Sequence, residues 1–146
     1  MTNLQEILKV ALAETFIFYL KSHNYHWNIE GPNFTQYHSF LGDLYDEVFD
    51  SIDPLAEHIR TLDVYVPGSC ERFKQLSKIQ DELLIRTPKE MFNNLLLDNS
   101  ILIGTLNEAF QAATEANKQG IANFLADRID IHEKHNWMIR SLLKNE

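Results

Sequence analysis

The long connection between the second and third helical segments constrains the fold of this chain most. Four segments show the three-and-four apolar spacing of amphipathic helices, and none alternates as a strand does. They cover approximately residues 3–26, 34–60, 88–117 and 121–143. About 25 residues separate the second segment from the third, too many for a hairpin loop. The other two links are short, and the order short, long, short predicts an all-α four-helix bundle with a crossover along its length.

Local signals mark the ends of these helices. A Thr2-x-x-Gln5 capping pattern opens the first. The run Thr87-Pro88-Lys89-Glu90 opens the third with an N-cap, a proline at the first helical position and a capping-box glutamate. Gly120 is expected to separate the third helix from the fourth, and a short helical patch over 71–79 is expected in the crossover.

The second helix carries the most regular apolar stripe of the four and one helix-breaking residue, Pro54. Pro54 removes the hydrogen bond to the Asp50 carbonyl, so we expect a kink there, at a cost of about 3 kcal/mol if uncompensated. The predicted core stripe consists of Phe34, Tyr37, Leu41, Leu44, Val48, Ile52, Leu55 and Ile59.

Composition narrows the class of protein. The chain of 146 residues suits one domain over 1–146, and no apolar run approaches the roughly 20 residues of a membrane span. Cys70 is the single cysteine, which excludes an intrachain disulfide and fits a reducing cytoplasm. The net charge of −8 repels phosphate backbones and attracts cations, which counts against nucleic acid as the main partner.

Six histidines are candidate metal ligands, but a lone histidine is usually structural. His23 and His26 are three residues apart near the end of the first helix, where either could act as a cap. His132 and His135 have the same spacing in the last helix, and there we expect a solvated or salt-bridged face. His58 points away from the neighbouring Glu57 and is given no role.

An acidic stripe follows the apolar stripe of the second helix. Asp43, Asp46 and Asp50 are expected to form a solvated face. Asp53 and Glu57 differ because they border a small second apolar surface that includes Phe49, as expected at a subunit interface. Two carboxylates four residues apart on a helix can hold one hard cation such as iron or manganese.

The spacing on this helix separates the candidate ligands. His38 and Asp53 are 15 positions apart, or about 22 Å along a helix axis, so they cannot hold the same ion within one chain. Two copies of the helix packed antiparallel about a twofold axis would bring His38 of one beside Asp53 and Glu57 of the other. A metal centre built from these residues therefore lies between subunits, and the twofold produces two of them.

The run His23-Asn24-Tyr25-His26-Trp27-Asn28-Ile29-Glu30-Gly31-Pro32-Asn33-Phe34 resembles the signature of the Dps family of mini-ferritins. His38, Asp53-x-x-x-Glu57 and the segment His132-Glu133-Lys134-His135-Asn136-Trp137-Met138 match the family's order and spacing. The resemblance implies a ferritin-like four-helix subunit with a short helix in the crossover, assembled into a twelve-subunit shell. It also implies oxidation of ferrous iron, preferentially by hydrogen peroxide, with ferric mineral stored inside.

The resemblance assigns roles to individual residues. His26 and His38 would bind iron from one subunit, and Asp53 and the bridging Glu57 from its twofold mate. His26 and Asp53 would complete the tighter iron position. Trp27 resembles an indole that the family keeps near the site, where it can intercept one-electron oxidants, although it equally fits plain interface packing.

Three positions depart from the family pattern. Gly42 stands where the family has an aspartate, so the second, weaker iron position loses a carboxylate. Pro54 is expected to re-aim Asp53 and Glu57. In the iron-entry pore of the family, the acidic positions fall at Lys118 and Asp127, so Asp127 keeps an acidic ring that Lys118 weakens.

Three functions remain open at this point. The first is an iron-oxidising and iron-storing shell that consumes peroxide. The second is a metal-binding shell whose oxidation site is slow because of Gly42. The third is DNA compaction, although the chain lacks the lysine-rich tails of many relatives and we expect no strong DNA binding. Zinc also takes histidine and carboxylate ligands, so iron is assigned by the resemblance.

Overall fold

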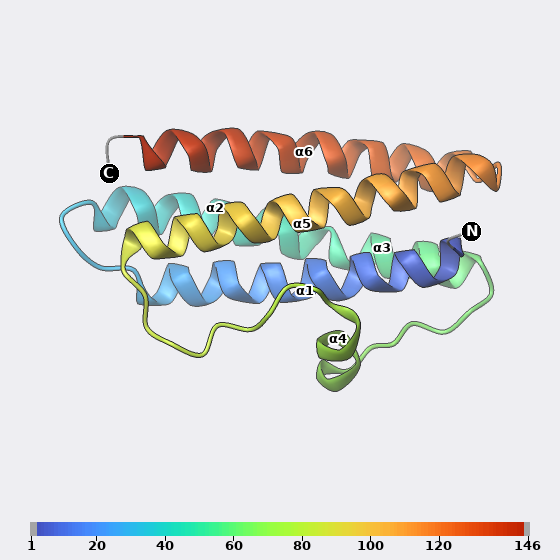
Figure 1. Cartoon of the computed structure of the whole chain (residues 1–146), viewed down its shortest axis with the longest axis horizontal. Coiled ribbons are helices and arrows are strands. Elements are labelled where there is room, and N and C mark those ends of the chain that lie inside the picture. The colour runs from blue at the N-terminus through green and yellow to red at the C-terminus, as the bar shows by residue number, and fades with distance from the viewer. Residues whose placement is uncertain (1–2, 145–146) are drawn as a thin grey trace.

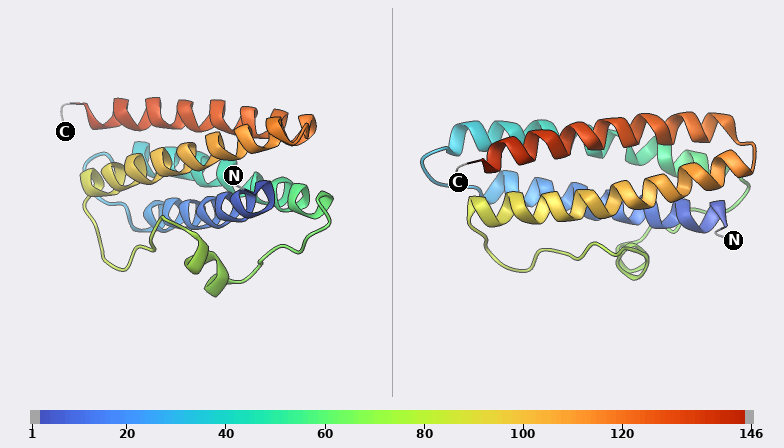
Figure 2. Two further views of the ribbon diagram at one scale, coloured as in Figure 1. Left: turned by 45° about the vertical axis from the view of Figure 1, so that its right-hand side comes forward. Right: turned by 45° about the horizontal axis from the view of Figure 1, so that its top comes forward.

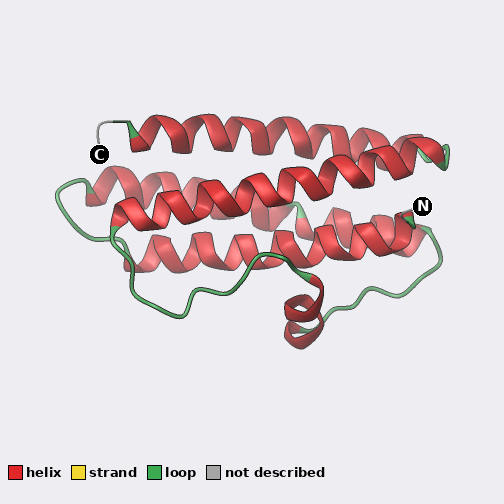
Figure 3. Cartoon of the chain, in the orientation of Figure 1, coloured by secondary structure: helices red, strands yellow, loops and turns green. Residues whose placement is uncertain are grey.

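The structure, a computed structural model, describes residues 3–144, which form six helices and no strand (Figure 3). The helices are α1 (Leu4–Asn28), α2 (Phe34–Asp50), α3 (Ile52–Thr61), α4 (Cys70–Leu76), α5 (Pro88–Glu115) and α6 (Gln119–Leu143). The prediction of an all-α fold is confirmed over this range. None of these helices combines the length and the apolar character needed to cross a membrane.

Four rods lie side by side in the bundle, namely α1, the succession α2–α3, α5 and α6 (Figure 1). Helix α1 packs against α2, α3 and α5, and α5 packs against α6. The short links make α1 antiparallel to α2–α3, and α5 antiparallel to α6 (Figure 2). The crossover carries α4 along the outside of the bundle beside α1, so the predicted connection order is confirmed.

Apolar side chains from all four rods form one core. Its largest fully buried members include Leu8, Leu12, Phe18, Leu41, Leu55, Ile59, Phe92, Leu95 and Leu102. The predicted stripe of the second helix is buried except at two positions. Phe34 is 43 % exposed because it begins α2 at the end of the bundle, where it stacks on His38, and Ile52 is half-buried at the start of α3.

The second helix is broken into two, as Pro54 predicts. The break is at Ser51, three residues before the proline, so the single kinked helix expected up to residue 60 is in fact two helices, α2 and α3. Ser51 is buried, and its hydroxyl donates a 2.6 Å hydrogen bond to the Val48 carbonyl. The Leu55 amide hydrogen-bonds the Ser51 carbonyl at 3.2 Å, which starts α3 one residue after α2 ends.

Side-chain caps mark the starts of α5 and α1. At the start of α5 the capping box is complete, with Glu90 N donating to Thr87 Oγ1 at 3.2 Å and Thr87 N donating to Glu90 Oε1 at 2.9 Å. Thr2 lies outside the described residues, and the N-cap of α1 is Asn3, whose side chain accepts from the Gln5 amide at 2.8 Å.

Two predicted boundaries in the second half of the chain are corrected. Gly120 lies inside the first turn of α6 and does not separate α5 from α6. The chain turns instead at Asn117, which takes a left-handed φ of 57°, a conformation that asparagine tolerates. The crossover helix spans 70–76, so it is shorter than the patch expected over 71–79.

Buried carboxylates attach the crossover to α1. Tyr25 donates a 2.6 Å hydrogen bond to Glu82, and Arg86 donates to the same carboxylate at 2.9 Å. Burial would raise the pKa of Glu82, but these hydrogen bonds outweigh it and lower the pKa to about 2. The Lys78 amide donates to the fully buried Glu14 at 3.0 Å, which ties the segment after α4 to α1.

Candidate metal centre

His26 and His38 form a stacked pair between α1 and α2. Their ring centroids are 3.7 Å apart and their planes differ by 18°. Each ring also hydrogen-bonds the backbone of the other residue: His26 Nδ1 is 2.8 Å from the His38 carbonyl oxygen, and His38 Nδ1 is 2.7 Å from the His26 carbonyl oxygen. The sequence-predicted histidines are therefore brought together where the C-terminal end of α1 meets the beginning of α2 (Figure 1).

These reciprocal hydrogen bonds determine the tautomer of both rings. A carbonyl oxygen only accepts, so both Nδ1 atoms carry the proton and donate it. In the neutral imidazoles, both Nε2 atoms then keep a lone pair. This is the arrangement in which a ligating histidine is oriented by its other ring nitrogen. The pair is ready to bind a cation through two Nε2 atoms without a change of tautomer.

Gly42 lies beneath the His26 ring, one helical turn after His38. A Cβ atom added at Gly42 would be 3.2 Å from His26 Cε1 and 3.4 Å from His26 Nδ1. The ring cannot retreat without lengthening its hydrogen bond to the His38 carbonyl. The departure at Gly42 therefore has a structural reason, because any side chain there would crowd the histidine that the hydrogen bonds hold in place.

Two glycine-to-alanine variants test this contact. Gly104 lies inside α5, and an added Cβ would meet nothing within 4 Å, so Gly104→Ala should raise the free energy of unfolding by about 1 kcal/mol through helix propensity. Gly42→Ala should gain measurably less, because the new methyl group presses on His26. Urea unfolding at one protein concentration measures both, and an equal gain in the two variants would contradict the contact.

Asp53 and Glu57 lie on α3 with exposed side chains. The rest of α2 and the break at Ser51 separate them from the histidine pair. Among residues 3–144, no three histidine, cysteine, aspartate or glutamate side chains come close enough to hold one metal ion within a single chain. Each chain thus offers a pair of histidines and a separate pair of acids. The assignment of these four residues to one centre stays a prediction.

Aromatic side chains continue the histidine pair along α1 and α2. Trp27 is 60 % exposed and stacks on His23 with a centroid distance of 3.8 Å. Tyr45 lies parallel to His23 at 3.8 Å and 8°, and its ring meets His26 edge-on at 5.2 Å. Sequence reasoning gave His23 only a possible capping role and missed Tyr45. The spacing of Tyr19, His23 and Trp27 by four residues was the available signal.

The solvated reading of His132 and His135 is wrong, and the salt-bridged reading is right for His135. Both rings are buried. His135 Nε2 is 2.8 Å from Glu47 Oε1, and the Arg128 guanidinium forms a two-pronged ion pair with the same carboxylate. His132 is held between Arg128, at 2.9 Å from Nε2, and Asn99, at 2.6 Å from Nδ1. This network joins α2, α5 and α6.

The network sets the charge of its members. Burial would raise the pKa of Glu47, but the hydrogen bonds from His135 and Arg128 outweigh it and lower the pKa to about 2. Burial, and then the positive charge of Arg128, lower the pKa of His132 well below 6.5. Arg128 Nη2 donates to His132 Nε2, so His132 Nδ1 carries the proton and donates to Asn99 Oδ1.

These shifts predict loss of stability in acid. The unfolded chain protonates His132 near its ordinary pKa of 6.5 and Glu47 near 4.5, whereas the folded chain resists both. The unfolded state therefore binds more protons below these values, so stability falls as the pH decreases. The Tm measured by circular dichroism should begin to fall below pH 6.5 and fall more steeply below pH 4.5. A Tm that stays constant between pH 6.5 and 4.5 would contradict the neutral, buried His132.

The remaining predicted positions lie elsewhere. Asp127 is exposed on α6, and Asp43, Asp46 and Asp50 are exposed as expected. The His58 ring packs against the Phe124 ring with a centroid distance of 4.8 Å, which is a structural contact.

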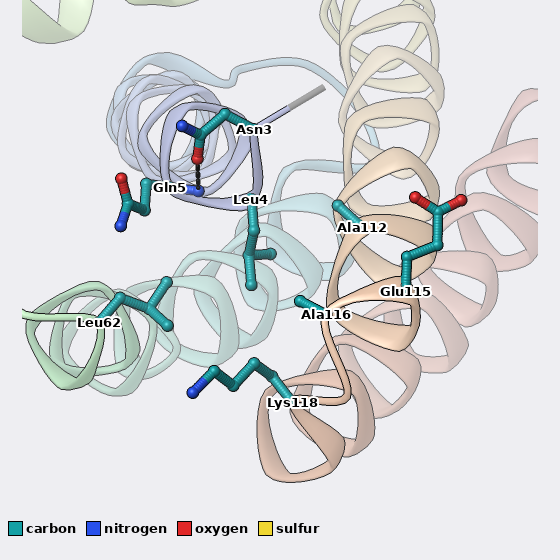
Figure 4. Close-up of a pocket in the computed structure, with 8 residues that line it drawn as sticks. All are labelled: Asn3, Leu4, Gln5, Leu62, Ala112, Glu115, Ala116 and Lys118. Carbon is teal, nitrogen blue, oxygen red and sulfur yellow. Dashed lines mark hydrogen bonds between the residues drawn. The ribbon is translucent and has the colours of Figure 1, made fainter. Parts of the chain in front are cut away.

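Lys118 lines a cavity of about 490 Å³ at the end of the bundle where α1 begins (Figure 4). Leu4, Leu62, Ala112 and Ala116 form its apolar wall. The cavity is at the opposite end of α1 from His26, so it is no part of the candidate centre.

Comparison with known proteins identifies the family of the chain. The ferritin-like domain family matches residues 5–146. A low temperature-induced protein of Nostoc sp. is 32 % identical over 96 % of this chain and 79 % of its own length. The DNA protection during starvation protein of Brevibacillus brevis is 31 % identical over 98 % of this chain and 99 % of its own.

Solved structures give the same result. Dps from Staphylococcus aureus has a TM-score of 0.94 and 26 % identity, with 100 % of both chains covered. Dps from Vibrio cholerae, described as one of the ferritin-like diiron-carboxylate proteins, has a TM-score of 0.92 and 28 % identity over 97 % of this chain and 89 % of its own. The chain belongs to the ferritin-like family, and within it to the Dps-type mini-ferritins. This membership supports iron binding and protection against oxidative stress as its general role.

Proposed function

We propose that this chain is the subunit of a shell that oxidises ferrous iron with hydrogen peroxide and stores the ferric product. The observation that carries the proposal is the His26–His38 pair, whose two Nε2 lone pairs are oriented by reciprocal hydrogen bonds before any ion arrives. Two imidazoles alone make an incomplete iron site, so the missing carboxylates have to come from elsewhere.

Asp53 and Glu57 of a second subunit supply those carboxylates. Packing two α2–α3 rods antiparallel about a twofold axis aligns the histidine end of one subunit with the acidic end of the other. Exposed Trp27 and Phe49, at 60 % and 52 %, give this face the apolar character of an interface. Each twofold then holds two centres, each with His26 and His38 from one subunit and Asp53 and Glu57 from its mate.

The ligand set determines the chemistry. Carboxylate and imidazole ligands favour Fe³⁺ over Fe²⁺, so they lower the barrier to loss of an electron from a ferrous substrate ion. Two ferrous ions at one centre deliver two electrons to one peroxide and yield two ferric ions and two hydroxides. With Glu57 as the bridging ligand, the two ions share one carboxylate. Because both electrons reach the same peroxide, the reaction releases no hydroxyl radical.

The shell is proposed to contain twelve subunits, with Asp127 contributing an acidic ring to the pore by which Fe²⁺ enters. Lys118 would weaken the attraction of that pore for cations. The net charge of −8 favours cations over nucleic acid. Some relatives are named for DNA protection, but we expect this protein to show no retardation of duplex DNA in a gel at moderate salt.

Anaerobic addition of Fe²⁺ followed by peroxide tests the proposal. The protein should convert the iron into a mineral that elutes with a particle of about twelve subunits in size-exclusion chromatography with light scattering. The colour of the mineral and the protein should coincide. Free ferric precipitate, or a monomeric protein that still binds its ion tightly, would contradict the intersubunit centre.

The absence of a side chain at Gly42 favours one alternative within the same fold. Because glycine supplies no carboxylate, the second iron position lacks a ligand, and the shell would bind metal yet oxidise it slowly. Anaerobic calorimetry distinguishes the two. One tight ferrous ion per centre with no peroxide-linked oxidation favours the slow shell, and two ions per centre with rapid oxidation favour the main proposal. Repeating the titration with Zn²⁺ shows whether zinc competes for the same ligands.

A further inference from the structure

The cavity at the end of the bundle lies where four helix ends meet (Figure 4). The start of α1, the end of α3, the end of α5 and the residue before α6 all contribute to its lining. Leu4 and Ala112 are each 8 % exposed and belong to the main core, so the cavity reaches the edge of that core. Its volume of about 490 Å³ lies within the range of roughly 300–1,000 Å³ that is usual for small-molecule sites.

The wall of this cavity is apolar. Figure 4 shows the side chains of Leu4, Leu62 and Ala116 turned toward one another across it. The Ala112 carbonyl behind the wall accepts a hydrogen bond from the Ala116 amide at 3.0 Å, so it is already paired. An alkyl chain gains free energy when it leaves water for such a wall, whereas a polar group would lose its hydration without a partner. The wall therefore favours an aliphatic ligand.

One cation lies at the edge of the cavity. The Lys118 side chain extends along this edge toward Leu62, whereas the Glu115 carboxylate is turned away from Leu4 (Figure 4). Within the part of the chain that the structure describes, the Lys118 ammonium forms no ion pair. Helix α6 begins next to Lys118 with no side-chain cap and no acid in its first turn, so the positive end of its dipole is not neutralised. The edge of the cavity is thus complementary to one negative charge.

We propose that this cavity binds an aliphatic monocarboxylate, with its alkyl chain on the apolar wall and its carboxylate on the Lys118 ammonium. A single ammonium matches a carboxylate better than a dianion such as a phosphate ester, which would keep one charge unpaired. The methylene stem of Lys118 covers part of the alkyl chain, while its charged end stays at the solvent edge. The cavity lies at the opposite end of α1 from His26, so this ligand site is separate from the candidate metal centre.

Calorimetric titration of the assembled, iron-free protein with octanoate tests the site. We expect saturable binding of one octanoate per subunit. Shorter carboxylates such as butanoate should bind more weakly, by about fourfold for each methylene group lost, as the burial of methylene groups predicts. Octyltrimethylammonium carries the same alkyl chain on a positive head group, and it should bind more weakly than octanoate because Lys118 repels it.

A change in the wall shows whether octanoate occupies this cavity. Ala116→Leu places a larger side chain inside it and should abolish octanoate binding. Ala116 is exposed at the C-cap of α5, so we expect the fold to be retained, which circular dichroism verifies. Ala126→Leu is the matched control, because it makes the same substitution at an exposed alanine of α6 outside the cavity lining. Octanoate should bind to this control as to the native protein.

A change in the charge tests the head group. Lys118→Met keeps an unbranched side chain but removes the ammonium, so it should weaken octanoate binding about fivefold, the upper end for an exposed ion pair. Binding of the neutral 1-octanol should stay unchanged in this variant. Lys134→Met is the matched control, because it removes the same charge from a side chain on α6 that is 66 % exposed and outside the cavity lining. It should leave octanoate binding unchanged.

Several results would overturn the proposal. They are absence of octanoate binding to the native protein, unchanged binding in Ala116→Leu, an equal loss in Lys118→Met and Lys134→Met, and binding of octyltrimethylammonium as tight as that of octanoate. If the native protein binds no octanoate and Ala116→Leu reduces the size of the assembly in light scattering, the cavity is instead a contact with a second copy of the chain. These measurements use no iron, so the carboxylate site and the proposed function can each fail without the other.

Discussion

Glu57→Gln should slow peroxide-linked oxidation of ferrous iron at least about 100-fold, because loss of even an outer-shell partner of a ligand costs a metal site roughly 10- to 100-fold. The amide keeps the size of the side chain but removes the negative charge that would bridge two cations. Glu57 is exposed in the single chain, so the fold of each subunit should be unaffected. Stopped-flow absorbance of the ferric product measures the rate, and light scattering measures the assembly.

Asp50→Asn is the matched control for this variant. It makes the same carboxylate-to-amide change on an exposed residue of the same acidic stripe, outside the predicted centre. Its oxidation rate should stay within a factor of two or so of the native protein, because a remote surface charge acts only through screened electrostatics. An equal loss of oxidation rate in the two variants would show a general effect of charge. A native oxidation rate in Glu57→Gln would show that Glu57 is not part of the centre.

Glu47→Leu should destabilise the subunit by about 3 kcal/mol, because it leaves a buried guanidinium without its carboxylate. Only 7 % of the Arg128 side chain is exposed, against 33 % of that of Glu47. We expect the low end of the range for broken buried ion pairs, since Glu47 itself reaches solvent. For a chain of this size the loss corresponds to a fall in Tm of about 10 °C in scanning calorimetry at fixed protein concentration.

Two further variants separate the buried charge from a general effect of leucine. Asp130→Leu removes the partner of Lys134 in an ion pair whose side chains are 66 % and 68 % exposed, and exposed pairs contribute about 0.5 kcal/mol or less. The double variant Glu47→Leu with Arg128→Met removes both charges and should recover part of the lost stability. If Glu47→Leu and Asp130→Leu lower the Tm by the same amount, the buried network does not stabilise the subunit more than an exposed ion pair does.

Most of the fold could be predicted because its signals are local. The capping box at Thr87 and Glu90 forms within one turn of chain, and the effect of Pro54 follows from a missing amide hydrogen. The errors arose where local rules compete. Glycine commonly ends helices, but here Asn117 and not Gly120 adopts the left-handed conformation. Phe34 is exposed because it lies at the end of the bundle, which its position in the apolar stripe does not reveal.

The candidate centre was predictable only in part. The residues of the histidine pair were found from a sequence motif, whereas their reciprocal hydrogen bonds depend on how α1 packs on α2. The Glu47 network was missed because its partners are 81 and 88 positions away on another helix. One signal was available, since Leu125, Arg128, His132, His135 and Ile139 follow the three-and-four spacing of a buried face.

The one-residue break at Ser51 divides α2 from α3, and these two helices carry every predicted ligand except His26. Before the break, the hydrogen bonds of the histidine pair hold α2 against α1. After the break, α3 carries Asp53 and Glu57 as a separate helix. In the proposed centre, the angle between α2 and α3 would determine how far the acids of one subunit reach toward the imidazoles of its mate. If the proposed centre forms, a change in one turn of backbone at Ser51 would alter the separation of the two cations without a change in any ligand.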